Sequence, residues 1–273
     1  MRSKGGLLKT ARGNEFWWIS FGHGTENIVM IPGLGDGLIT VKGKAFLGNT
    51  LFPKLASSYR MTVISRKNNL EIYSDTRSMA RDQAEAMEEL GIRKAHVIGI
   101  SQGGMIAQHL AADNPQLIDK LILVATCPRS NPMIEGNIMR WFDMANFLDY
   151  SGLITDMNEK AHPEKYMKKL RPLIPLISLF GRPLSYERFM IQGKACLSQD
   201  ASKRLSGITS PTLIMGGELD ETLGPEPSRE LNRAIPGSKL YMYPDHGHAL
   251  YEDAKDFCDR IDSFIQLGTF IPG

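Results

Sequence analysis

Ser101 is flanked by Gly99 and Gly103, and together they form the pattern G-x-S-x-G. Residues 97–100 before the serine are apolar and mostly β-branched, which predicts a buried strand. Residues 102–112 have a helical pattern. A strand, a sharp turn and a helix suit a nucleophilic serine, because the turn lifts the hydroxyl above the sheet edge and the nearby glycines leave room for it.

Two later segments supply an acid and a base for such a serine. The apolar strand predicted at 211–215 leads into an acidic turn, and the strand predicted at 238–243 leads into two histidines. Because the carboxyl ends of parallel strands meet at one edge of a sheet, we expect both segments to lie near Ser101. A histidine can take the serine proton as the serine attacks a carbonyl carbon, and a carboxylate can hold the histidine tautomer.

The acidic turn offers three carboxylates. Asp220 lies three residues after Gly217, and this G-x-x-D spacing favours it over Glu218 and Glu221. The alternative is a solvated acidic turn without a catalytic role. Ser101 also has a structural explanation, because serine is a favoured residue at a helix N-cap.

The segment after the strand at 238–243 contains His246 and His248. We favour His248 as the base because it follows Gly247 and precedes the last predicted helix. Asp245 and the two histidines also suggest a metal site, but no third-ligand pattern such as H-E-x-x-H is present, so neither a metal nor another cofactor is expected. The other histidines are interpreted as surface or structural residues: His23, His96, His109 and His162.

A glycine-rich loop at 32–37 follows the strand predicted at 27–31. Such a loop is often only a turn. Its position also suits an oxyanion hole, in which backbone N–H groups stabilise the negative charge that develops on a carbonyl oxygen. The loop lacks the G-x-G-x-x-G spacing and a Walker lysine, so phosphate binding is not indicated.

The predicted elements alternate between strands and helices in two parts of the chain, 1–127 and 207–273. Strands are predicted at 27–31, 60–65, 95–100, 120–125, 211–215 and 238–243, and helices at 75–90, 102–113, 226–234 and 249–267. The β-prone run 16–21, with Gly22 and Gly24 supplying the turn, predicts an opening hairpin. This alternation indicates an α/β fold with a mostly parallel sheet and helices on both faces.

The segment 128–206 breaks the alternation, because it has helical stretches with large apolar side chains and no continuous β-rich strand. We expect it to be a helical cap inserted after the sixth strand of a core made of residues 1–127 and 207–273. Most of its aromatic side chains should serve core packing, but a cap at the ligand-binding edge must also roof the site. The candidates for a wall that contacts substrate are Trp141, Phe142 and Phe147.

The composition limits the partners of the chain. Among 273 residues, 32 basic and 30 acidic side chains give a net charge of +2, so there is no electrostatic case for binding nucleic acid or an acidic membrane. The 3 cysteines lie far apart, which suits a reducing compartment. No signal peptide or membrane span is predicted, so we expect a cytoplasmic protein. The expected partner is a small-molecule substrate, and the sequence does not specify an oligomeric state.

These segments resemble the α/β-hydrolase superfamily, in its serine hydrolase and esterase branch with a helical cap. The resemblance covers almost the whole chain: the Pro-Gly loop, the segment LGIRKAHVIGISQGG, the G-x-x-D step ending at Asp220, and Gly-His at 247–248. It implies an eight-stranded, mostly parallel sheet. It also implies that Ser101 is the nucleophile, His248 the general base and Asp220 the acid that orients the histidine.

The resemblance further implies an oxyanion hole made of two backbone N–H groups, from Leu34 and Gln102. The family often has His-Gly before the first of these residues, whereas this chain has Pro32 and Gly33. Because the donor is a main-chain amide, Leu34 can still serve. Some relatives place the acid near the position of Cys127, and a thiol cannot do that work, which favours Asp220.

The implied activity is hydrolysis of an ester-like acyl bond of a small, moderately hydrophobic substrate through an acyl-enzyme. The same triad serves C–C bond hydrolases, thioesterases, acyltransferases and cofactor-free haloperoxidases, so these remain alternatives. Some members of the superfamily bind or sense small molecules without turnover, which is an alternative of a different class. Reaction with a serine-directed fluorophosphonate separates an enzyme from such a binder.

Overall fold

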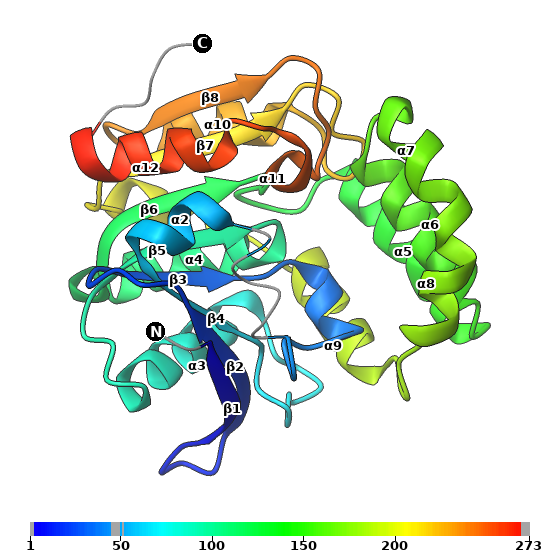
Figure 1. Cartoon of the computed structure of the whole chain (residues 1–273). Coiled ribbons are helices and arrows are strands. Elements are labelled where there is room, and N and C mark those ends of the chain that lie inside the picture. The colour runs from blue at the N-terminus through cyan, green and yellow to red at the C-terminus, as the bar shows by residue number, and fades with distance from the viewer. Residues whose placement is uncertain (1–2, 45–49, 51, 269–273) are drawn as a thin grey trace.

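The computed structural model describes residues 3–44, 50 and 52–268. In these ranges one sheet has eight strands in the order β1-β2-β4-β3-β5-β6-β7-β8 (Figure 1). The strands are β1 (Lys4–Lys9), β2 (Glu15–Phe21), β3 (Asn27–Ile31), β4 (Arg60–Ile64), β5 (Ala95–Ile100), β6 (Ile118–Val124), β7 (Thr212–Gly217) and β8 (Lys239–Tyr243). β1, β2 and β4 pair in antiparallel fashion, and the sheet is parallel from β4 to β8. The predicted fold class is confirmed.

The opening hairpin exists, but its turn lies at 10–14 and not at 22–24. The Thr10 amide donates to the Asn14 carbonyl at 2.9 Å, and Gly13 adopts a φ of +82°. Gly22 instead lets the chain pass close to α2, because a Cβ there would lie 2.2 Å from the Tyr59 carbonyl oxygen. The predicted position of the turn was wrong because the less apolar segment 4–9 also forms a strand.

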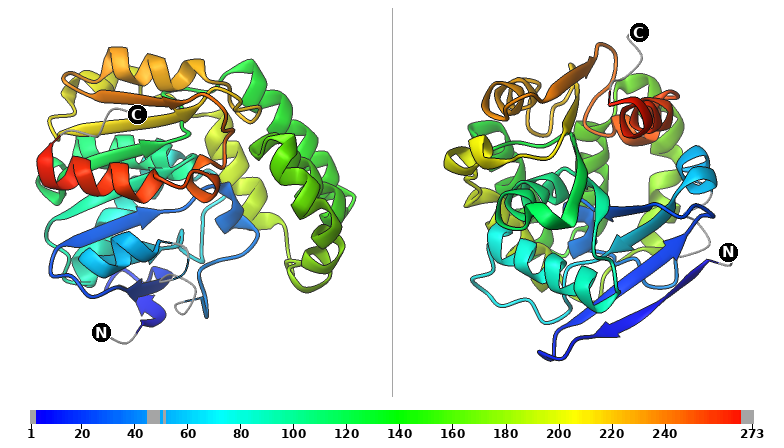
Figure 2. Two further views of the ribbon diagram at one scale, coloured as in Figure 1. Left: turned by 45° about the horizontal axis from the view of Figure 1, so that its top comes forward. Right: turned by 90° about the vertical axis from the view of Figure 1, so that its left-hand side faces the viewer.

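Helices cover both faces of the sheet, as predicted (Figure 2). One face carries α3 (Thr76–Glu89), α4 (Gln102–Asp113) and α10 (Glu226–Ala234), and the other carries α2 (Pro53–Ser58) and α12 (Phe257–Leu267). α3 begins where predicted because Asp75 and Ser78 form a reciprocal capping box. No helix in the described part of the chain is long and apolar enough to cross a membrane.

The last predicted helix, 249–267, is two helices. α11 (Leu250–Asp253) ends at Ala254, where the backbone is extended (φ −83°, ψ 118°), and α12 starts at Phe257. The apolar periodicity continues across the break, because residues of both helices pack against the same core, so the pattern alone did not reveal it. The sequence at 44–57 also favours a helix, weakened by Gly48 and Pro53, and the described part of this segment contains α2. Residues 45–49 and 51 lie outside the described residues, as do residues 269–273, where the sequence predicts a loose tail.

Between β6 and β7 the chain is helical. It forms α5 (Pro132–Asn146), α6 (Tyr150–Ala161), α7 (Glu164–Leu170), η4 (Arg171–Leu173), α8 (Ile174–Phe180), α9 (Glu187–Leu197) and η5 (Ser202–Gly207). We call α5 to α9 the cap helices. α5 to α8 lie together beyond one edge of the sheet, and α9 lies between them and the sheet (Figure 1). An apolar cluster joins the cap helices to Leu34, in η1 (Leu34–Gly37), and to Met105 in α4, so the cap helices pack directly on the elements around Ser101.

Candidate active site

Ser101 occupies the sharp turn between β5 and α4. Its backbone has φ 54° and ψ −119°, a left-handed region that a residue with a side chain adopts only under constraint. A Cβ at Gly103 would lie 1.9 Å from the Ile31 carbonyl oxygen, and one at Gly99 would lie 2.6 Å from Gly104, so glycine is required at both positions. Ser101 makes no capping hydrogen bond with its side chain, so helix capping does not explain this serine.

The predicted acid and base lie in one hydrogen-bonded line with this serine. His248 Nε2 lies 2.9 Å from Ser101 Oγ, and His248 Nδ1 lies 2.8 Å from Asp220 Oδ2. The other carboxylate oxygen of Asp220 accepts hydrogen bonds from the backbone N–H groups of Thr222 at 2.8 Å and Leu223 at 3.0 Å. Asp220 and His248 are buried, at 4% and 7% exposure, so the line is shielded from water except near the serine.

The competing residues on the same loops point elsewhere. His246 lies 2.8 Å from Asp245 and packs its ring against Tyr243. Glu218 pairs with Arg229, and Glu221 pairs with Lys160 of α6. In the described ranges, no three side chains of the types that bind metals converge.

Leu34 and Gln102 both lie beside the serine. Each is the first residue of a helix, η1 and α4 respectively, and the first N–H groups of a helix have no acceptor within it. Gly33 brings the loop close, because a Cβ at this position would lie 3.3 Å from Ser101 Cβ. The arrangement provides two main-chain amides next to the serine on elements from different parts of the sequence.

Arg66, which the sequence interpretation did not single out, holds this loop. Its guanidinium donates to the Pro32 carbonyl and to the Gln102 side-chain oxygen, the latter at 2.8 Å. Its backbone N–H donates to Asp36 at 3.0 Å, and Arg188 of α9 donates to the same carboxylate oxygen at 3.1 Å. Burial lowers the pKa of Arg66 to about 10, so it stays charged at neutral pH. The feature of the sequence that could have identified Arg66 is its position directly after a predicted strand, at the functional edge of the sheet.

The cap helices contact each part of the site. The Gln102 side-chain amide donates to the Gln192 carbonyl of α9 at 2.7 Å. Asn137 of α5 donates to the Thr222 carbonyl at 2.9 Å, on the loop that carries the acid. The Ala249 N–H, on the loop that carries the histidine, donates to the carbonyl of Ala161 at the end of α6 at 2.9 Å. The positions of the acid, the histidine and the amide at 102 therefore depend on helix packing between β6 and β7.

A cavity of about 100 Å³ lies at the serine. Its walls come from the two loops and the cap helices: Leu34, Gly35, Ser101, Ile134, Ile138, Trp141, Met157, Ala161, Cys196, Thr222 and His248. Trp141 belongs to this wall, and its indole N–H is held by Asp156 at 2.9 Å. Most of the lining is apolar, and none of these residues carries a fixed positive charge.

Two of the three cap residues predicted to contact substrate do not line this cavity. Phe142 lies inside the cap, where its ring meets Phe189 edge-on at 6.2 Å and approaches Gly193. Phe147 is 85% exposed, because α5 ends at Asn146 and the chain turns there with Leu148 at a φ of 57°. Neither residue lines the cavity at Ser101, and their contact with substrate stays a prediction; aromatic composition does not show which face of a cap helix meets the core.

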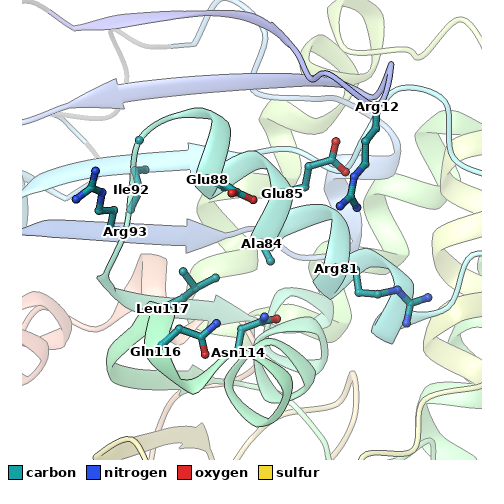
Figure 3. Close-up of a pocket in the computed structure, with 11 residues that line it drawn as sticks. Arg12, Arg81, Ala84, Glu85, Glu88, Ile92, Arg93, Asn114, Gln116 and Leu117 are labelled. Atoms are coloured by element: carbon teal, nitrogen blue, oxygen red, sulfur yellow. The ribbon is translucent and has the colours of Figure 1, made fainter.

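Figure 3 shows the residues that line a larger hollow of about 690 Å³. Arg12, Arg81, Arg93, Glu85 and Glu88 are among its lining residues. Arg93 comes just before β5, so the hollow lies where that strand begins, whereas Ser101 follows its end. None of the residues that line it is a serine, cysteine or histidine, so the candidate chemistry lies with the smaller cavity.

Comparisons with known proteins agree with this architecture. The sequence family described as the α/β-hydrolase fold matches residues 27–150. The chain is 25% identical over 280 residues to 2-hydroxy-6-oxononadienedioate/2-hydroxy-6-oxononatrienedioate hydrolase of Cupriavidus pinatubonensis, covering 89% of this chain and 88% of that one. It is 23% identical over 246 residues to pimeloyl-[acyl-carrier protein] methyl ester esterase of Vibrio cholerae, covering 86% and 96%.

Solved structures share the fold. An α/β-hydrolase enzyme from a Medee basin deep-sea metagenome library superposes with a TM-score of 0.81 and 19% identity, over 98% of this chain and 99% of that one. At this identity the likeness concerns the fold. The names of the sequence relatives support hydrolase activity and describe two kinds of substrate. One is a diacid that carries a ketone, and the other is a methyl ester.

Proposed function

Because the chain belongs to the α/β-hydrolase superfamily, we propose that it is a serine hydrolase that cleaves an ester-like acyl bond of a small, moderately hydrophobic substrate. The observation that carries the proposal is the hydrogen-bonded line from Ser101 through His248 to Asp220, which ends in a small, mostly apolar cavity. The esterase relative supports the ester bond as the target.

The reaction follows from the positions of these atoms. Ser101 Oγ attacks the carbonyl carbon while His248 Nε2, 2.9 Å away, takes its proton. Asp220 accepts the Nδ1–H of His248, which fixes the tautomer and stabilises the imidazolium. The N–H groups of Leu34 and Gln102 stabilise the oxyanion of the tetrahedral intermediate.

The intermediate then collapses to products. His248 returns the proton to the leaving alkoxide oxygen, which departs as the alcohol and leaves an acyl-enzyme on Ser101. A water molecule, deprotonated by the same imidazole, attacks the acyl carbon. The ester of Ser101 breaks, the proton returns to Ser101 Oγ, and the carboxylic acid is released.

The lining of the cavity supports an uncharged group at the reacting centre. Its side chains are mostly aliphatic, with Trp141 at one wall and no lysine or arginine. Burying a carboxylate there would remove it from water without a cation to pair with it, which is strongly unfavourable. A neutral acyl ester enters such a cavity without this penalty.

Cleavage of a C–C bond is the second candidate, and one relative favours it. The diacid named for the Cupriavidus enzyme contains no ester bond, so its hydrolysis must break a carbon–carbon bond. The same serine and histidine could act on such a ketone. We favour the ester because the lining of the cavity at Ser101 supplies no cation for a carboxylate bound at the reacting centre.

The test is hydrolysis of p-nitrophenyl esters from acetate to dodecanoate by the wild-type protein, Ser101→Ala and Ser206→Ala. Ser206 is an exposed serine in η5, so its variant controls for the loss of a hydroxyl elsewhere. We expect turnover in the wild type and in Ser206→Ala and none in Ser101→Ala. Turnover that persists in Ser101→Ala contradicts the proposal.

Labelling by a fluorophosphonate separates the alternatives when no ester is hydrolysed. A label on the wild type that is absent in Ser101→Ala indicates an active serine and directs the search to C–C bond substrates. A folded protein that is neither labelled nor active contradicts the proposal and favours the alternative of a small-molecule binder.

A further inference from the structure

The cavity at Ser101 is too small for a whole substrate of moderate size. It measures about 100 Å³, whereas an engineered apolar cavity that binds one benzene molecule measures about 150 Å³. Pockets that bind small molecules usually measure about 300 to 1,000 Å³. Most of a moderately hydrophobic substrate must therefore lie outside this cavity.

A second cavity, of about 630 Å³, lies next to the first. Neighbouring residues of the chain line the two cavities. Gly33, Ile100 and His162 line the larger cavity, and Leu34, Ser101 and Ala161, each adjacent in sequence to one of them, line the smaller one. At Gly33 the separation is small, since a Cβ there would lie 3.8 Å from Ser101 Oγ. The larger cavity thus begins within a few bond lengths of the serine hydroxyl.

The larger cavity offers mainly apolar surface from both the core and the cap helices. Its apolar lining includes Met30, Phe52, Ile100, Leu170, Leu173 and Tyr251. Leu170 ends α7 and Leu173 lies in η4, so the cap helices form one wall and the sheet edge forms the other.

The polar groups on one side of the larger cavity are mostly engaged with one another. His162 Nδ1 lies 2.9 Å from Asp253 Oδ2, and the Tyr166 hydroxyl donates to the Asp253 carbonyl at 2.6 Å. The Glu252 side chain is half-exposed, and its carboxylate lies 3.9 Å from His162 Nε2. Lys169 is exposed. Besides Lys169 and Glu252, the surface available to a ligand is mainly aliphatic and aromatic.

We propose that the larger cavity binds an extended apolar chain of the substrate while the small cavity holds the group on the other side of the scissile bond. The inference rests on the proposed function and specifies its substrate class: an ester with one short and one long apolar arm. An unbranched hydrocarbon chain suits the cavity, whether it belongs to the acyl group or to the alcohol.

Three esters show whether the long chain belongs to the acyl group or to the alcohol. Methyl acetate has two short arms, methyl octanoate has a long acyl arm, and octyl acetate has a long alcohol arm. Acid release is followed by pH-stat titration. Burial of each additional methylene raises kcat/KM about fourfold, so one octyl-length ester should exceed methyl acetate by at least a hundredfold. Equal kcat/KM values for all three esters would overturn the inference.

Filling the larger cavity provides the decisive variant. The measured quantity is the chain preference, defined as kcat/KM for the preferred long ester divided by kcat/KM for methyl acetate. Leu170→Trp should lower this ratio by about tenfold or more. Leu173→Trp is the second variant if the first does not fold. Leu176→Trp is the matched control, because Leu176 lies in the next turn of the same segment, is 57% exposed and does not line the cavity. Its ratio should equal that of the wild type. A ratio in both cavity variants equal to that of the control would overturn the inference.

Binding to Ser101→Ala keeps the inference testable if the protein hydrolyses no ester. Titration calorimetry measures the affinity of Ser101→Ala for methyl octanoate and octyl acetate, with and without Leu170→Trp. Binding of one long ester that Leu170→Trp weakens supports the chain site even if the proposed function fails. Absence of binding, or binding that Leu170→Trp leaves unchanged, overturns the inference whatever the fate of the proposed function.

Discussion

The guanidinium of Arg66 donates a hydrogen bond of 2.8 Å to the side-chain oxygen of Gln102, the residue that supplies one of the two proposed oxyanion N–H groups. The same guanidinium donates to the carbonyl of Pro32, two residues before the other proposed donor, Leu34. One buried cation thus joins the two halves of the proposed oxyanion hole. Because Arg188 of α9 shares Asp36 with Arg66, the cap helices are linked to it as well.

Arg66→Lys should therefore lower kcat by about 10- to 100-fold, with a smaller effect on KM. A lysine keeps the charge but lacks the planar fork that reaches both acceptors. The effect should be less than the loss of roughly 100- to 1,000-fold typical for removing an oxyanion donor itself. Steady-state kinetics on the p-nitrophenyl esters check this, with Arg77→Lys on α3 as the control, since Arg77 forms an exposed pair with Asp113. An effect on KM alone would argue against a positioning role for Arg66.

The three residues of the proposed triad should respond unequally to substitution. His248→Ala should cost about as much as Ser101→Ala, roughly 10⁶-fold in kcat, and Asp220→Asn roughly 10⁴-fold, because the serine and histidine act as a unit. His246→Ala is the matched control, since this ring faces Asp245 and Tyr243. An inactive His246→Ala with an active His248→Ala would show that the base is the other histidine.

Asn137→Ala should destabilise the protein and weaken catalysis together. Its side-chain amide donates to the carbonyls of Glu221 and Thr222 on the loop that carries Asp220. Removing it leaves a buried carbonyl without a partner, which costs about 1 to 3 kcal/mol of the free energy of unfolding. Denaturant unfolding measures this loss, with the exposed Asn146→Ala as the control. Equal stability of the two variants would show that this contact does not anchor the cap helices.

His162 should make stability depend on pH. Burial opposes protonation of its ring, but the hydrogen bond and the charge of Asp253 outweigh burial and raise the pKa of His162. The charged pair therefore stabilises the fold fully below the ordinary histidine pKa, about 6.5, and this contribution is lost as the pH rises through the raised pKa. His162→Gln should accordingly lower the Tm more at pH 6 than at pH 9. A larger loss at pH 9 would contradict this assignment.

The local pattern of the chain predicted most of the core elements and the pattern of chemistry around Ser101. Strands, α3, α4 and α10 appear within a few residues of their expected bounds, because apolar periodicity, Gly91 and the capping pair Asp75 and Ser78 act over short distances. Ser101 directly follows β5, and Asp220 and His248 lie on the loops after β7 and β8, so the topology of a parallel sheet brings all three to one edge. Their catalytic roles stay a prediction.

The structure differs from the expected arrangement where distant contacts decide the conformation. The opening hairpin turns at 10–14 because β1 pairs with β2 along its whole length, and the glycine at 22 serves a close approach to Tyr59 instead. Phe142 and Phe147 are both aromatic residues near the end of α5, yet one is buried against Phe189 and the other is exposed. Composition does not distinguish them, since only the packing of the cap helices determines which face is covered.

The sequence by itself determined which residue types stand at the ends of the strands, and hence the fold and the candidate nucleophile, acid and base. Only the tertiary structure decided that Arg66 bridges Pro32 and Gln102, that Trp141 and not Phe147 lines the cavity, and that a second, larger cavity begins behind Gly33. The physical reason is the range of the interactions. Periodicity and turn chemistry act between neighbours along the chain, whereas a cavity and a buried guanidinium depend on several segments meeting in space.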